Sequence, residues 1–221
     1  MTKQRISYVD PATMPEEMRV VVERSAREGT PRPESQCIRA HAPGAFWAFE
    51  NSWQAVFRTG VCEHAIKELC RVYVSASVKC EYCGNQRSVR AAKSGLVEQD
   101  YKDLLNFMAS SRFDARQKAA LSLAEAITWD LPADDALWDA LHRHFSEPEI
   151  VELGCFIALT MGQQRFLRTL NIDHHRVLAG TAASMAPGLE TREAYEQAKQ
   201  SPDYWARQDV VISRKDRPAA E

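Results

Sequence analysis

Residues 67–96 read KELCRVYVSASVKCEYCGNQRSVRAAKSGL, and this stretch decides the fold and the chemistry expected of the chain. Four of its residues recur at the spacing of one helical face: Leu69, Val72, Tyr73 and Ala76. They predict a helix over residues 63–77. The run VYVSASV also suits a strand, but the sequence offers no partner strand for it. A second helix is predicted over residues 80–93, ending at Gly95.

The second helix carries two thiols, Cys80 and Cys83, three residues apart. Side chains at this spacing share a helical face, so the two thiols can close a small disulfide ring. At a helix start they face unpaired N–H groups and the positive end of the helix dipole, which both favour the reactive thiolate. Arg87, one turn after Cys83, adds a cation that would lower the thiol pKa further.

Thiol chemistry also moves protons, so we looked for a base near the pair. Glu68 is the leading candidate, because it lies twelve residues before Cys80 on the preceding predicted helix. His64 lies one turn before Glu68 on the same face and is placed to relay a proton or to orient the carboxylate. The candidate site is therefore Cys80, Cys83, Glu68, His64 and Arg87.

Six cysteines in 221 residues are too few for a disulfide scaffold, and a CxxC pair in a reducing compartment suggests redox or metal chemistry. Zinc needs about four ligands. Cys62 and Cys70 are available as two more, but their spacing matches no standard zinc module. We therefore expect no metal and no organic cofactor. Cys70 and Cys155 lie in apolar helical patterns and are predicted to be buried.

Composition narrows the partners and the compartment. The chain is 45% hydrophobic and 26% charged with a formal charge of −2, so nothing favours nucleic acid as a partner. No apolar run approaches the roughly 20 residues that span a bilayer, so no membrane is expected. The first residues, MTKQRISYVDPATMPEE, lack the apolar core of a secretory signal, and the protein is predicted to be cytoplasmic.

The rest of the chain also predicts helices, and the fold class is all-α. The further predicted helices cover residues 14–29, 43–59, 97–108, 115–130, 134–145, 146–170 and 191–200. The segment TPRPES after Gly29 is predicted to be a loop, and the tail SRKDRPAAE has little to bury.

Three of these helices carry further signals. Asp114 and Asp134 are predicted N-caps, and Ser146 with Glu149 has the spacing of a capping box. The helix that follows is apolar almost all round until Gln163, which predicts a central, buried helix. The aromatic row between Phe46 and Phe57 predicts core or a subunit interface.

The stretch from Lys67 to Leu96 resembles the signature of the carboxymuconolactone decarboxylase-like superfamily, which includes the alkyl hydroperoxidase AhpD. In that signature a Glu precedes, by a dozen residues, a CxxC followed four residues later by His. HAPGAFWAFENSWQAVF upstream, and QKAALSLAEAITWD and SEPEIVELGCFIALTMGQQRF downstream, extend the resemblance over roughly residues 40 to 172.

The resemblance implies an AhpD-like helical bundle with the CxxC at the start of a core helix, assembled as a homo-oligomer, commonly a trimer or hexamer. It divides the chain into a helical extension (residues 1–39), an AhpD-like domain (40–185), and a C-terminal helix with a charged tail (186–221).

The resemblance also implies roles for the site residues. Cys80 and Cys83 would be the redox pair, with Cys83 attacking peroxide and Cys80 closing the disulfide. Glu68 matches the relay carboxylate. Arg87 stands where the family has its relay His, and arginine cannot shuttle protons near neutral pH. Either His64 or water replaces that histidine, or the dithiol serves another redox task.

The expected function is a thiol-dependent hydroperoxidase or disulfide reductase acting on a small peroxide and restored by an external dithiol. Two alternatives stay open. One is a decarboxylase-like lyase for a small lactone acid, with Arg71 and Arg87 clamping a carboxylate. The other is a non-enzymatic redox sensor in which Cys80 and Cys83 switch conformation.

Overall fold

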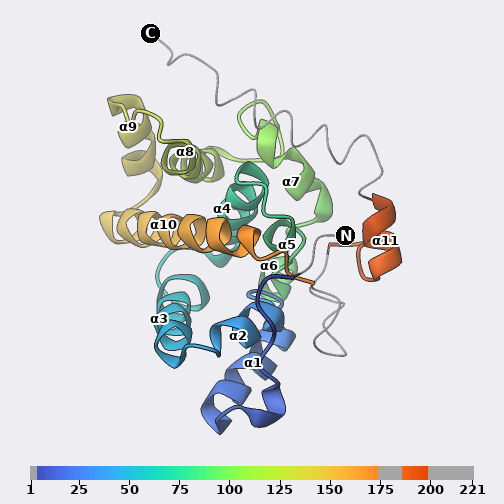
Figure 1. The fold of residues 1–221 in the computed structure, drawn as a ribbon. Coiled ribbons are helices and arrows are strands. Elements are labelled where there is room, and N and C mark those ends of the chain that lie inside the picture. The colour runs from blue at the N-terminus through green and yellow to red at the C-terminus, as the bar shows by residue number, and fades with distance from the viewer. Residues whose placement is uncertain (1–3, 174–185, 199–221) are drawn as a thin grey trace.

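The computed structural model describes residues 4–173 and 186–198, and within these ranges every regular element is a helix (Figure 1). The longer helices are α1 (Glu16–Glu28), α2 (Pro33–Arg39), α3 (Pro43–Trp53), α4 (His64–Ser77), α5 (Glu81–Gly84), α6 (Val89–Lys93), α7 (Glu98–Asp103), α8 (Ala115–Trp129), α9 (Asp135–His144), α10 (Glu147–Thr169) and α11 (Arg192–Ala198). The all-α prediction is confirmed. The predicted tail SRKDRPAAE lies outside the described residues, and the division into three regions stays a prediction.

Helix α4 is the centre of the molecule, and α8 and α10 pack against it while α9 covers α8 (Figure 1). Leu69, Cys70 and Tyr73 of α4 have no exposed surface. Because α4 is enclosed by other helices, its side chains that are not apolar need partners inside the protein. This requirement shapes the candidate site.

The predicted helix starts are confirmed by their caps. The Asp114 carboxylate accepts the Gln117 N–H at 2.8 Å, and the Asp134 carboxylate accepts the Leu137 N–H at 2.9 Å. Ser146 N–H donates to the Glu149 carboxylate at 2.8 Å. Each contact satisfies a backbone group that a helix end leaves open, so local sequence fixes where α8, α9 and α10 begin.

The N-terminal region has one helix that the sequence pattern missed. The segment TPRPES was predicted to be a loop, but Pro33 begins α2. Proline fixes the backbone angle that a helix start requires and needs no hydrogen-bond acceptor for its nitrogen, so it suits this position. The predicted helix over residues 43–59 is present as α3 followed by a π-helical turn, Gln54–Arg58.

The aromatic row that begins in α3 is part of the core, which was one of the two predictions made for it, core or subunit interface. Ring centroids lie 5.3 Å apart for Phe49 and Trp53, 4.4 Å for Trp53 and Phe57, and 5.2 Å for Phe57 and Phe156. The row therefore ties α3 and the π-helical turn to α10.

Helix α10 is less buried than predicted. Leu153 and Ile157 have no exposed surface, but Val151 is 65% and Phe166 is 46% exposed. Cys155 is exposed as well, so the prediction that it is buried is wrong. Cys155 is two residues from Leu153, which places it on the opposite face of the helix, away from α4 and α8.

The predicted helix over residues 80–93 is also wrong in its length. The CxxC does begin a helix, but α5 is a single turn, and a break separates it from α6. Residues 97–108 likewise divide into α7 and a 3₁₀ turn, Leu104–Asn106. Within the described residues, no helix has both the length and the apolar character needed to cross a membrane.

We predict that Leu153→Ala lowers the free energy of unfolding by about 2–5 kcal/mol, because it leaves a cavity between α10, α4 and α8. Val151→Ala is the matched control on the same helix and should change it by less than about 0.5 kcal/mol. Urea denaturation monitored by circular dichroism measures both. Equal losses for the two variants would contradict this packing of α10.

Candidate functional site

Cys80 and Cys83 form a disulfide at the start of α5, with their Cα atoms 5.3 Å apart. Cys80 is the N-cap residue, and its sulfur accepts the backbone N–H of Cys83 at 3.4 Å. Both residues are buried, with exposed fractions of 1% and 2%. The two predicted thiols are therefore brought together at a helix start.

Beneath the disulfide, Glu68 and Arg71 of α4 form a buried, two-pronged ion pair. Arg71 Nε lies 2.7 Å from Glu68 Oε2, and Arg71 Nη2 lies 2.9 Å from Glu68 Oε1. The side chains are 2% and 0% exposed. Two charges this far from water are tolerated only when paired and hydrogen-bonded, and parallel contacts of this kind are the strongest form of such pairing.

The same ion pair holds the backbone that carries the disulfide. Arg71 Nη1 donates to the carbonyl of Cys83, and Nη2 donates to that of Gln86, each at 2.8 Å. Glu68 Oε1 accepts the N–H of Ser88 at 2.9 Å. Arg71 thus ties the carbonyls of Cys83 and Gln86 to α4 at the point where the chain passes from α5 to α6.

His64 belongs to this network but does not contact either cysteine directly. Its Nδ1 lies 3.1 Å from the carbonyl of Phe57, and its Nε2 lies 2.7 Å from Ser88 Oγ. A carbonyl only accepts, so the ring proton is on Nδ1 and Nε2 accepts from Ser88. Burial lowers the pKa of His64. Ser88 therefore links a neutral His64 to Glu68.

Arg87 makes its contacts with α7 and with the backbone after Cys83, and its predicted effect on the thiol pKa stays a prediction. Its guanidinium binds both carboxylate oxygens of Glu98, at 2.9 and 2.7 Å, and stacks on Tyr101. It also donates to the carbonyls of Gly84 and Gln86. Glu98 offsets the positive charge of Arg87. The guanidinium that binds the backbone carbonyl of Cys83 is that of Arg71, which the sequence suggested only as a carboxylate clamp in the lyase alternative.

A small cavity of about 30 Å³ lies against Cys83, between α10 and the N-terminal region. Its lining includes Cys83 but not Cys80. Two lining residues on α10, Thr160 and Gln164, each have a buried side-chain oxygen without a hydrogen-bond partner, Thr160 Oγ1 and Gln164 Oε1. Neither residue was predicted from the sequence, although both are polar positions in the second half of a largely apolar helix.

The other wall of this cavity comes from residues 30–39, which the sequence assigned to an extension. Ser35 N–H donates to Tyr82 Oη at 3.1 Å, and Arg32 N–H donates to Gln86 Oε1 at 3.2 Å. Arg39 Nη2 donates to Gln163 Oε1 at 2.9 Å. The N-terminal region thus encloses the CxxC segment.

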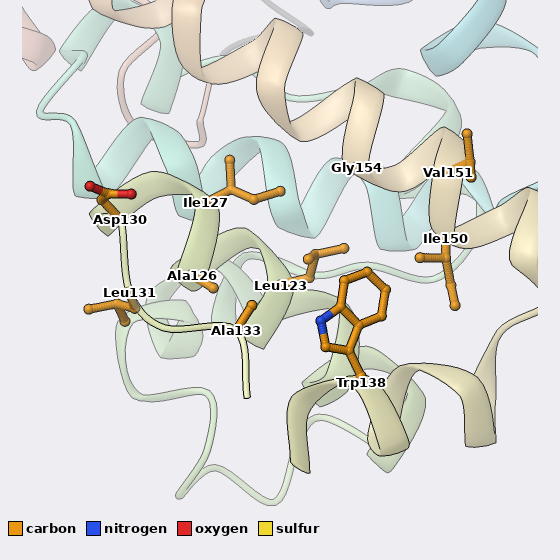
Figure 2. Close-up of a pocket in the computed structure, with 10 residues that line it drawn as sticks. All are labelled: Leu123, Ala126, Ile127, Asp130, Leu131, Ala133, Trp138, Ile150, Val151 and Gly154. Carbon is orange, nitrogen blue, oxygen red and sulfur yellow. The ribbon is translucent and has the colours of Figure 1, made fainter. Parts of the chain in front are cut away.

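A second, larger cavity of about 470 Å³ lies between α8, α9 and α10 (Figure 2). Its walls are mostly apolar: Leu123, Ala126, Ile127, Asp130, Leu131, Ala133, Trp138, Ile150, Val151 and Gly154. Asp130 is its one ionisable lining residue, and no thiol or histidine lines it. It therefore lacks the groups that thiol chemistry needs.

The remaining thiols in the described residues are unsuited to the reaction, with one exception. Burial raises the pKa of Cys37 to about 12 and that of Cys62 to about 11, and it raises the pKa of Cys70 well above its usual value. Only Cys155 is exposed. The described residues contain no cluster of three or more His, Cys, Asp or Glu side chains arranged to hold a metal ion.

Comparison with known proteins supports this class of fold. Residues 43–126 match the model of the Carboxymuconolactone decarboxylase family. The structure superposes on the alkylhydroperoxidase AhpD core of a peroxidase-related protein from Ralstonia eutropha JMP134 with a TM-score of 0.65 and 20% identity, over 78% of this chain and 93% of the other. The predicted resemblance to the superfamily that includes AhpD is confirmed.

Two further proteins are similar. The debrominase Bmp8 has 18% identity and a TM-score of 0.62, over 76% of this chain and 89% of its own. An uncharacterized protein of Mycobacterium tuberculosis is 33% identical over 135 residues, which are 60% of this chain and 47% of that protein. The chain thus spans about half the length of the curated relative it matches.

The buried His64 predicts a pH dependence of stability. Its folded-state pKa is lowered from 6.5, so below about pH 6.5 the unfolded chain binds a proton that the folded chain refuses. His64 therefore contributes stability above pH 6.5 that is lost as the pH falls toward its folded-state pKa. Urea denaturation at pH 7.5 and 5.5 measures how much free energy of unfolding is lost on acidification. This loss should be smaller in His64→Gln than in the wild type, by up to about 1.4 kcal/mol per pH unit.

The exposed His142 on α9 provides the control. His142→Gln should keep the wild-type dependence of the free energy of unfolding on pH. A His64→Gln profile parallel to that of the wild type would contradict the burial of a neutral imidazole.

Proposed function

We propose that the protein is a thiol-dependent hydroperoxidase or disulfide reductase that uses the Cys80–Cys83 pair. The observation that carries this proposal is the placement of Cys83 in the wall of a small cavity, with Cys80 behind it in disulfide-bonding contact. A reacting thiol and a resolving thiol need this arrangement, in which only the first meets the substrate.

In the proposed reaction, the reduced Cys83 attacks a peroxide oxygen and becomes a sulfenic acid. Cys80 then attacks the Cys83 sulfur, water leaves, and the disulfide described above is formed. An external dithiol supplies two electrons and two protons to restore the thiols. In the disulfide reductase reaction, the reduced pair instead attacks a substrate disulfide through a mixed disulfide, releases it as two thiols, and is itself left as the Cys80–Cys83 disulfide.

The surrounding residues have supporting roles in this proposal. Arg71 holds the Cys83 carbonyl and so fixes the backbone of the reacting cysteine, while Glu68 offsets the charge of Arg71. Glu68 fixes Arg71 and accepts the N–H of Ser88, so its role here is that of a positioning residue. His64 orients Ser88, and Arg87 anchors α5 to α7 through Glu98. The homo-oligomer and the cytoplasmic location stay predictions.

The lyase alternative is less well supported by this geometry. Arg71 and Arg87, the two side chains expected to clamp a carboxylate, are paired with Glu68 and Glu98. The cavity beside Cys83, of about 30 Å³, is also small for a lactone acid. The sensor alternative differs from the proposed enzyme in turnover. With excess dithiol, an enzyme consumes many equivalents of peroxide, whereas a sensor stops after one.

Cysteine variants test the assignment of roles. In reduced Cys80→Ser treated with hydrogen peroxide, we expect sulfenic acid on Cys83, trapped by dimedone and located by mass spectrometry. In Cys83→Ser, Cys80 should react no faster than free cysteine, because it does not line the cavity. Cys155→Ser is the control and should form the Cys80–Cys83 disulfide at the wild-type rate. Rapid sulfenic acid formation on Cys80 in Cys83→Ser would reverse the assignment.

A further inference from the structure

The cavity beside Cys83 contains two polar atoms that the protein leaves unsatisfied. Thr160 is 1% and Gln164 is 5% exposed, yet Thr160 Oγ1 and Gln164 Oε1 have no hydrogen-bond partner. The two residues are four apart on α10, so they lie on one face of the helix. A buried polar atom without a partner costs free energy and is uncommon, so two beside one reactive sulfur point to a bound ligand.

The hydrogen bonds define what that ligand must offer. Gln164 Nε2 donates to the carbonyl of Arg71 at 3.1 Å, which fixes the amide and leaves Oε1 as an acceptor for the cavity. The ligand must therefore donate a hydrogen to Gln164. A threonine hydroxyl both donates and accepts, so Thr160 can serve an adjacent oxygen.

The size of the cavity limits the ligand further. A cavity needs about 10–15 Å³ to hold one water molecule. A volume of about 30 Å³ thus holds about two non-hydrogen atoms. Apolar side chains, among them Phe49, Trp53 and Leu167, form part of the wall. Among the lining residues Gln163 alone is not fully buried, so the cavity meets solvent near it.

We propose that Thr160 and Gln164 bind the hydroperoxyl group of the substrate at Cys83, and that hydrogen peroxide fits this site better than a hydroperoxide with a branched carbon. This inference rests on the proposed function and names its substrate class. Gln164 Oε1 accepts the O–H of the hydroperoxyl group, and the Thr160 hydroxyl donates to its neighbouring oxygen. The two bonds hold an O–O group beside the Cys83 sulfur.

The chemical step balances within this arrangement. The Cys83 thiolate forms an S–O bond with one peroxide oxygen, and the O–O bond breaks with its electron pair passing to the other oxygen. That oxygen takes the proton that Cys83 gave up and leaves as water. Cys83 is oxidised to the sulfenic acid, the peroxide is reduced, and Thr160 stabilises the leaving oxygen through its hydrogen bond.

The test compares Thr160→Val and Gln164→Leu with the wild type. The second-order rate constant for oxidation of reduced Cys83 by hydrogen peroxide should fall at least about fivefold in each, as loss of one hydrogen bond implies. Reduction of the disulfide by dithiothreitol should keep its wild-type rate, because it needs no hydroperoxyl site. Thr160→Val should keep or raise the melting temperature, since it removes an unsatisfied hydroxyl.

Thr128→Val is the matched control. Thr128 is 2% exposed, its hydroxyl also lacks a partner, and it lies on α8 outside the cavity lining. In this variant, hydrogen peroxide should oxidise reduced Cys83 at the wild-type rate. In the wild type, cumene hydroperoxide should react at least about tenfold more slowly than hydrogen peroxide, because its branched carbon does not fit the cavity.

The outcomes separate the two proposals. If the wild-type thiols react with hydrogen peroxide no faster than free cysteine, the proposed function fails and this inference fails with it. If the wild type reacts rapidly and Thr160→Val and Gln164→Leu do as well, the inference alone is overturned. Equal rates for cumene hydroperoxide and hydrogen peroxide would also overturn it.

Discussion

The ion pair between Glu68 and Arg71 determines the geometry of the candidate site. It is buried in the centre of the bundle, where two charges persist only if their hydrogen-bonding groups are satisfied. The pair obtains these partners from the chain that follows α4, namely the carbonyls of Cys83 and Gln86 and the N–H of Ser88. The contacts that satisfy the two charges therefore also position the disulfide. Removing either Glu68 or Arg71 alone should lower the free energy of unfolding by about 3–5 kcal/mol.

The consequences of this interaction extend to the chemistry. Because Arg71 holds the Cys83 carbonyl, Cys83 is presented to the cavity under α10 while Cys80 remains behind it. The Arg71 carbonyl also accepts from Gln164, so the same residue orients one wall of the cavity. The site therefore combines the guanidinium of Arg71, the acceptor oxygen of Gln164 and the two adjacent sulfurs of the cysteine pair. Burial raises the pKa values of the buried free thiols Cys37, Cys62 and Cys70 and keeps them unreactive.

Much of the fold followed from the sequence because its signals are local. Helical periodicity and the caps at Asp114, Asp134 and Ser146 involve residues a few positions apart, and these predictions are confirmed. The contacts around the break after α5 are not local, since a side chain of α4 reaches carbonyls a dozen or more residues away. The same holds for Arg87, whose partner Glu98 lies in another helix, and for the cavity walls from α2 and α10. The exposure of Cys155 depends on which face of α10 stays uncovered.

The central claim is that the Glu68–Arg71 pair positions Cys83 for reaction with a hydroperoxide. The double variant Glu68→Gln, Arg71→Met removes both charges together, so no uncompensated buried charge is left and folding should be retained. The deciding measurement is its second-order rate constant for Cys83 oxidation by hydrogen peroxide, compared with that of the wild type. The account predicts a fall of at least about tenfold at an unchanged helical content. A wild-type rate in the folded double variant would contradict it.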